Sequence, residues 1–241
     1  MLTAFPNPSS GRIFLPNMRY WMKGMSRIYF PHSMTNSITK SFSLLLMAWL
    51  PCSALLSQSA WELKKNKDSI CIYTRSTEAS KFNELKVVFN LHGNFEQLRS
   101  VILDVNHYKD WVYASKVSTL VEKRSSDEMV YYAEVSVPWP LANRDYYSDT
   151  RVWVDSAKKQ MRISSCNLIN KYGEKEHIVR VPFLKAEWTI SMLTASMMHV
   201  EYILNWNPGG SVPAWIANMF STNAPYQSFT QLQKRMAFLN P

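Results

Sequence analysis

Apolar and polar residues alternate along most of the chain beyond residue 60, and this alternation predicts a half-buried β-sheet. It is strongest in segments 186–192 and 198–206, where every second residue is apolar. Short polar turns between consecutive segments favour antiparallel pairing. Further strands are predicted at 61–67, 70–75, 85–91, 115–123, 129–137, 146–154, 160–167 and 178–181.

Two segments follow the helical period instead. The first comes after Asn94, a good N-cap residue with Gln97 at the capping-box position, and predicts a helix over about 95–105. The second starts near Pro213, which suits a first helical turn, and continues its apolar stripe to Met236. Pro225 is expected to kink or restart this helix, because proline lacks the backbone N–H. The predicted class is therefore α+β.

Two proline-containing segments interrupt this pattern. Residues 137–146 read V-P-W-P-L-A-N-R-D-Y and separate two predicted strands. Proline cannot donate to a β-ladder, so the chain must leave the sheet at this corner and then return to it. Residues 207–216 read N-P-G-G-S-V-P-A-W-I and mark the place where the last strand gives way to the C-terminal helix.

The corner and the second segment together resemble the START domain family (steroidogenic acute regulatory protein-related lipid transfer), and the order of elements from 61 to 236 agrees. The resemblance implies a helix-grip fold, in which a curved antiparallel β-sheet wraps around a long C-terminal helix. It also implies a START-like lipid-binding domain over 60–241, with a hydrophobic tunnel that holds one lipid. We therefore expect a non-enzymatic protein that shields a hydrophobic ligand or transfers it between membranes.

Aromatic and methionine side chains on the predicted strands and C-terminal helix are candidates for the tunnel wall, because both line adaptable apolar sites. In the family, the corner loop lies over the tunnel mouth, so it becomes a candidate lid and membrane-touching tip. The alternative for each residue is ordinary core packing, or a corner built for stability. The candidate lipid-binding residues are Trp139, Leu141, Trp153, Trp188, Met192, Tyr202, Trp215 and Met219, with Trp206 as a further wall candidate.

Charged residues near the corner are assigned structural roles. Arg144 and Asp145 are expected to fix the corner by pairing or by backbone hydrogen bonds. Sterol-binding relatives carry an acid–base pair on the flanking strands, but here Arg151 falls on the opposite face from the required position. We expect most charges inside strands to face water.

No catalytic motif accompanies these elements. The five histidines lack metal-ligand spacing, and neither a G-x-S-x-G elbow nor a glycine-rich phosphate loop occurs, so no metal and no cofactor are expected. Two alternatives remain open. One is a polyketide-cyclase-like enzyme on the same scaffold, and the other is an envelope interaction module whose own side chains fill the tunnel.

The net charge of +9 is unevenly distributed. Residues 1–59 hold five basic and no acidic residues, and subtracting those five from the 27 basic residues leaves 22 against 18 acidic ones, a net +4. This weak excess, without a basic stripe, argues against nucleic-acid binding. It is compatible with transient contact with an anionic membrane. We expect a monomer whose partner is a lipid or another hydrophobic small molecule.

The acid-free N-terminus predicts export. Residues 34–59 have the plan of a secretory signal peptide: a basic start, an apolar run at 42–56 and small residues before a cleavage site after Ser59. The mature protein would then be periplasmic or extracellular. An uncleaved membrane anchor and an organellar transit segment are the alternatives. Residues 1–33 are interpreted as a spurious or disordered extension, with Met34 as the true start.

Two cysteines fall in predicted strands of the mature part, Cys71 and Cys166. An exported protein could pair them. Two buried free thiols are the favoured interpretation, and the pairing stays open.

Overall fold

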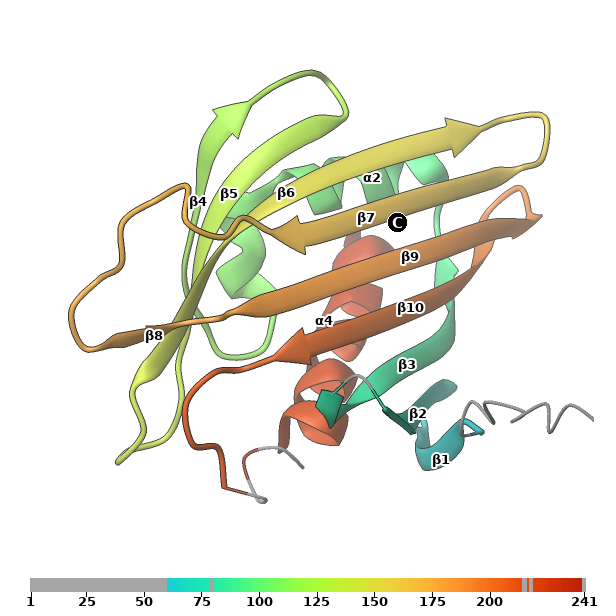
Figure 1. Cartoon of the computed structure of the whole chain (residues 1–241). Helices are drawn as coiled ribbons and strands as arrows, with labels where there is room; N and C mark the ends of the chain where they lie inside the picture. Colours follow the sequence, from blue (N-terminus) through green and yellow to red (C-terminus); the bar gives the residue numbers. More distant parts are fainter. Residues whose placement is uncertain (1–59, 79, 214–215, 217–218, 240–241) are drawn as a thin grey trace, which may run out of the picture. The chain divides into compact units, whose positions relative to one another are not determined.

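The computed structural model describes residues 60–239, except 79, 214–215 and 217–218. Their main feature is a ten-stranded sheet with strand order β1-β2-β3-β10-β9-β7-β6-β5-β4, and β8 beside β6. Figure 1 shows the sheet curving around the C-terminal helix, α4. This confirms the predicted α+β helix-grip fold. The predicted signal segment 34–59 and the extension 1–33 lie outside the described residues.

The strands match the predicted segments closely. They are β1 (Glu62–Lys67), β2 (Ile70–Thr77), β3 (Ser80–His92), β4 (Ser115–Lys123), β5 (Glu128–Val135), β6 (Asn143–Asp155), β7 (Gln160–Asn167), β8 (Ile178–Arg180), β9 (Phe183–Thr194) and β10 (Met197–Asn207). All pairings are antiparallel except that of β8 with β6, which is parallel. The predicted antiparallel sheet is confirmed, with β8 as its parallel exception, where a loop brings a short strand back alongside the start of β6.

The alternating residues form the core where the strands meet. Val200 of β10 lies between Phe89 of β3 and Ile190 of β9, and all three side chains are buried. The intervening polar residues of β9 face outward. The period of two therefore separates one face that packs against the helices from one that faces solvent.

The first helix, α2 (Phe95–Leu103), begins with the predicted capping box. The side chain of Asn94 accepts a hydrogen bond from the Gln97 amide at 3.0 Å, and Gln97 accepts one from the Asn94 amide at 3.0 Å. The helix ends two residues earlier than predicted, and a 3-10 segment, η2 (Val105–Asp110), continues the chain. Trp111 follows directly and is buried beside Tyr108.

The C-terminal helix α4 (Ala224–Phe238) follows a π-helical turn, η3 (Met219–Asn223). The regular α-helix therefore starts anew next to Pro225, as predicted. Pro225 stands in the first turn, where the missing N–H would have had no helical partner. Phe229, Leu232 and Met236 form its buried face. Within the described part of the chain, no helix is both long and apolar enough to cross a membrane.

Candidate functional site

A cavity of about 220 Å³ lies between the sheet and α4. Its wall is mostly apolar and aromatic, with contributions from the inner faces of β3, β5, β6, β9 and β10, from η2 and from α4. A curved sheet and one helix enclose more space than their side chains fill at this position. Enclosed, largely apolar cavities with few polar groups are typical small-molecule sites.

Aromatic side chains build two parts of the wall. In the first, Trp188, Tyr202 and Phe229 pack edge to face, with ring centroids 5.0–5.4 Å apart. In the second, Tyr131 packs against Tyr108 at 5.4 Å and against Tyr146 at 6.2 Å. Burial raises the pKa of Tyr108, Tyr131, Tyr146 and Tyr202, so these hydroxyls are neutral near pH 7. The aromatic wall is therefore uncharged.

The structure divides the predicted wall residues into three groups. Trp188, Tyr202 and Trp206 line the cavity. Met192 is half-buried and packs against the core without lining the cavity. Trp215 and the side chain of Met219 lie outside the described residues.

Trp153 is not part of the wall. It is 50% exposed, whereas its neighbour Val152 is buried. Adjacent residues of a strand point to opposite faces of the sheet. An assignment of the inner face that is shifted by one residue therefore selects Trp153 in place of Val152. The placement of Trp153 in the wall is therefore wrong.

The sequence interpretation missed part of the lining. Tyr108 and Trp111 reach the cavity from η2 and the residue after it, and Tyr131 and Tyr146 reach it from the strands beside the corner. Period-two alternation in segments 129–137 and 146–154 was the available signal for the last two. Nothing in the chain order indicates that η2 faces the same space as α4.

The corner between β5 and β6 projects from the sheet. Trp139 is 90% exposed, and Pro138 and Pro140 beside it are exposed too, while Leu141 is half-buried. The Leu141 amide donates to the Pro138 carbonyl at 3.2 Å and closes a tight turn. Neither Trp139 nor Leu141 lines the cavity. Their predicted role as lid and membrane tip stays a prediction.

Arg144 and Asp145 point to opposite faces of β6. Asp145 accepts two hydrogen bonds from the guanidinium of Arg180 on β8, at 2.7 and 3.1 Å. Arg144 lines the cavity and donates to the carbonyl of Ala142 within the corner. The two residues therefore do not pair with each other, and each holds a different part of the corner region.

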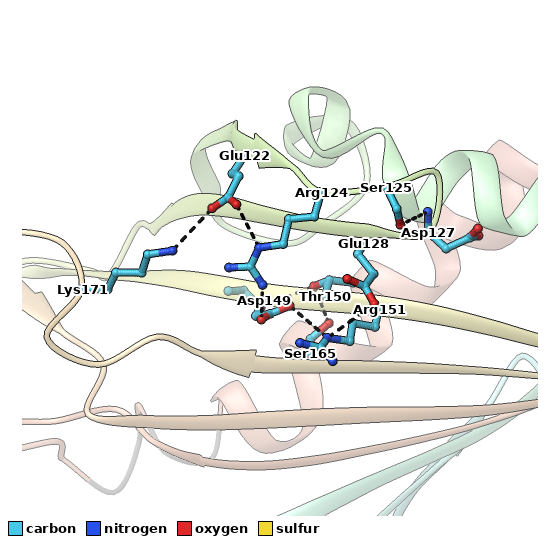
Figure 2. Close-up of polar contacts among 11 residues, drawn as sticks. Glu122, Arg124, Ser125, Asp127, Glu128, Asp149, Thr150, Arg151, Ser165 and Lys171 are labelled. Carbon is cyan, nitrogen blue, oxygen red and sulfur yellow. Dashed lines mark hydrogen bonds and ion pairs between the residues drawn. The ribbon is translucent and has the colours of Figure 1, made fainter. Parts of the chain in front are cut away.

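Other strand charges form an ion-pair network outside the cavity, on β4–β6 (Figure 2). Arg124 donates to Asp149 at 2.6 Å and to Glu122 at 3.1 Å, and Lys171 contacts Glu122 at 3.4 Å. The hydrogen bond from Arg124 lowers the pKa of Glu122. Arg151 joins the network through Asp149 and is exposed, as predicted. None of these five residues lines the cavity.

The remaining ionisable groups of the described residues lie away from the cavity lining, which contains no Asp, Glu or His. The described residues contain no group of three or more His, Cys, Asp or Glu side chains placed to hold a metal. Glu134 is buried, but it faces away from the cavity and pairs with Lys116 at 2.8 Å. Cys71 and Cys166 are both free thiols; Cys71 is half-buried and Cys166 is exposed, so the expectation that both are buried is wrong for Cys166.

Comparison with known proteins agrees with this architecture. The START domain profile matches residues 48–238, and the chain belongs to the START domain family. The mouse (Mus musculus) phosphatidylcholine transfer protein is 31% identical over 172 residues, which cover 70% of this chain and 79% of that protein.

Two solved structures share the fold. The STAR-related lipid transfer protein from Xanthomonas axonopodis superimposes with a TM-score of 0.67 at 24% identity, covering 73% of this chain and 98% of that one. Human StAR-related lipid transfer protein 5 superimposes with a TM-score of 0.64 at 12% identity, covering 85% and 97% of the two chains.

Proposed function

We propose that this START domain protein binds one lipid in the cavity between the sheet and α4 and carries it between membranes. The observation that carries the proposal is the largely apolar wall of that cavity, built from aromatic side chains whose tyrosines are neutral near pH 7. Burying an acyl chain in such a site gains about 0.8 kcal/mol per methylene, so tight binding needs no reactive group. The name of the mouse relative, a phosphatidylcholine transfer protein, supports a lipid ligand.

The protein acts without catalysis in this proposal. The tyrosines of the wall keep their protons near neutral pH, and the buried carboxylate of Glu134 lies outside the cavity. A cyclase on the same scaffold would need a general base facing its substrate, and among the described residues no Asp, Glu or His lines the cavity. The open volume also argues against an interaction module whose own side chains fill the tunnel.

Lipid exchange requires a membrane-contacting element, and the β5–β6 corner is the best candidate. An indole that is 90% exposed, beside two exposed prolines, combines a large apolar surface with a polar N–H. Such side chains partition to the interface of a bilayer. The corner is joined directly to the cavity through Arg144, so a bilayer contact there would lie next to the bound lipid.

The site of action is proposed from the N-terminal sequence alone. The signal-like segment 34–59 supports export, so the lipid would be carried in the periplasm or outside the cell by a monomer. This part of the proposal is independent of the cavity and can fail without affecting it.

Native mass spectrometry of the purified chain tests lipid binding. We expect one additional mass of lipid size per protein, which is removed by organic solvent and regained from phospholipid vesicles. Transfer of labelled lipid from donor to acceptor vesicles should speed up in proportion to protein concentration. A chain that carries no lipid and does not speed up transfer would contradict the proposal.

A further inference from the structure

Among the described residues that line the cavity, Arg144 is the one cationic side chain. Arg144 is 6% exposed and is the second residue of β6. Strand alternation turns Arg144 and Tyr146 toward the cavity and turns Asp145 away from it. The guanidinium of Arg144 therefore lies in the same space as the aromatic wall.

Among the described residues, this guanidinium has no carboxylate partner. All 18 acidic residues of the sequence lie within the described part of the chain, and none of them forms an ion pair with Arg144 there. Its hydrogen bond in the described structure goes to the carbonyl oxygen of Ala142. Desolvation lowers the pKa of Arg144, with no carboxylate to offset the effect of burial.

Arg180, on the neighbouring strand β8, shows how the same fold satisfies an arginine that has a structural role. Its guanidinium donates to both carboxylate oxygens of Asp145 and to the carbonyls of Tyr172 and Gly173, at 2.7–3.2 Å. Within the described structure, four hydrogen bonds thus hold Arg180, against one for Arg144. A guanidinium has five N–H donors, and burying an unpaired charge costs free energy.

The cation is positioned for the polar end of an amphipathic ligand. Val135 on β5 and Val181 after β8 line the cavity near it, as does Pro208 in the segment after β10. A Cβ placed on Gly210 would lie 4.0 Å from Nη2 of Arg144, and Gly210 itself is exposed. The guanidinium therefore lies close to the exposed Gly210, and the cavity that it lines also reaches the aromatic ring of Phe229 on α4.

We propose that Arg144 binds an anionic oxygen group of the ligand, the phosphate of a phospholipid or the carboxylate of a fatty acid, while its chains lie along the aromatic wall. The inference rests on the proposed function and adds the chemistry of the polar head. A guanidinium matches two oxygens of a phosphate or carboxylate at once. The ligand then supplies the partner that the protein chain does not.

The test compares lipids that share their hydrocarbon chains and differ in the polar group. Phosphatidylcholine and diacylglycerol with the same oleoyl chains form one pair, and oleic acid and oleyl alcohol form the other. Loading of the delipidated chain is measured by native mass spectrometry in competition. We expect the wild-type protein to prefer the anionic-oxygen member of at least one pair by about 10- to 100-fold, the range for hydrogen bonds to charged groups. The pair that shows the larger preference identifies phosphate or carboxylate.

Substitution assigns that preference to the residue. Arg144→Gln should remove the preference and leave loading of diacylglycerol or oleyl alcohol within about twofold. Arg162→Gln removes the same charge from an exposed position on β7 and should keep the preference. Arg144→Lys keeps the charge but loses the two-pronged geometry, so it should keep part of the preference.

Three results would overturn the inference. A wild-type protein that loads both members of each pair equally has no anionic-oxygen site, even though it binds lipid, and this measurement needs no variant to fold. Equal losses for charged and neutral lipids in Arg144→Gln would mean that the residue only supports the corner. Failure of the wild-type chain to load any of the four lipids would overturn the proposed function as well.

Discussion

At the scale of single residues, side chains of one strand lie in three different environments: the cavity, the core and the solvent. On β9, Ala186 and Trp188 line the cavity, Met192 packs against the hydrophobic core, and Thr189 is exposed. Substitutions along this strand therefore distinguish effects on ligand space from effects on folding.

Ala186→Leu should fill ligand space at little cost to folding. Ala186 is buried and lines the cavity opposite Leu204 of β10. Because the added methylenes enter open space, we expect the lipid-free protein to change its free energy of unfolding by less than about 1 kcal/mol. Lipid loading should fall severalfold. Urea denaturation and native mass spectrometry measure the two quantities, and Thr189→Leu on the outer face is the control. A protein that unfolds yet loads lipid normally per folded molecule would show that this position is ordinary core.

Glu134 gives the stability a defined pH dependence. Burial raises its pKa, but hydrogen bonds from Lys116 and Asn143, with the charges of Lys116 and Lys175, outweigh burial and set the pKa below its ordinary value of 4.5. A lowered folded-state pKa stabilises the fold above pH 4.5, and this contribution is lost as the pH falls through the folded-state value.

Glu134→Gln should therefore lower the free energy of unfolding by about 1 kcal/mol at pH 7. The difference from wild type should shrink steadily below pH 4.5. Urea midpoints at several pH values measure it. Glu187→Gln, which disrupts an exposed pair with Lys185, should have almost no effect at pH 7. A difference for Glu134→Gln that does not depend on pH would contradict the assignment.

At the scale of elements, the corner between β5 and β6 joins the outside to the cavity. Its tip is exposed at Trp139, and its base holds Arg144 through the Ala142 carbonyl. Loops with few ladder hydrogen bonds open at lower free energy than strands. The corner is therefore suited to move during lipid exchange.

Trp139→Ala should slow lipid transfer between vesicles severalfold without lowering the melting temperature or the amount of lipid bound. The exposed indole contributes little to core packing, so its removal should weaken contact with the membrane and leave the fold intact. Trp153→Ala removes another exposed indole, on the outer face of β6, and serves as the matched control. Equal transfer by both variants and wild type would place the membrane contact elsewhere.

The sequence predicted elements better than it predicted which side chains share a space. The capping box at Asn94 and the alternation of β9 and β10 depend on neighbours within a few residues, so both were readable. The inner face of β6 depends on register with two other strands, and the assignment failed at Trp153. The parallel return of β8 and the approach of η2 to α4 depend on long-range packing, which no local pattern encodes.

The role of Arg144 could likewise not be predicted from its sequence neighbours alone. Its position in the corner motif predicted a structural role, and the bond to Ala142 fits that role. The missing carboxylate partner is visible only once the strands are paired, because Asp145 turns toward Arg180 on β8. A functional interpretation of the charge therefore required the three-dimensional arrangement.

At the scale of the whole molecule, the extent of the mature protein decides where the lipid can be carried. The START profile match begins at residue 48, inside the apolar run 42–56, whereas the predicted cleavage site follows Ser59. Segment 48–59 is therefore either removed with the signal or retained with the domain. The two alternatives predict different N-termini for the mature protein, and they predict that it is recovered in different subcellular fractions.

Cleavage after Ser59 should give a mature chain that starts at Ala60, recovered in the periplasmic or secreted fraction. Small residues before the cut are what signal peptidase requires, so Ser59→Leu should leave the precursor uncut and bound to membranes. N-terminal sequencing and fractionation measure both outcomes, and Gln58→Leu, which keeps the small residues Ser57 and Ser59 on either side, serves as a control that leaves the site intact. A wild-type chain found in the membrane pellet with residues 48–59 attached would refute cleavage. The segment would then be an anchor or part of the domain, and lipid exchange would take place at that membrane.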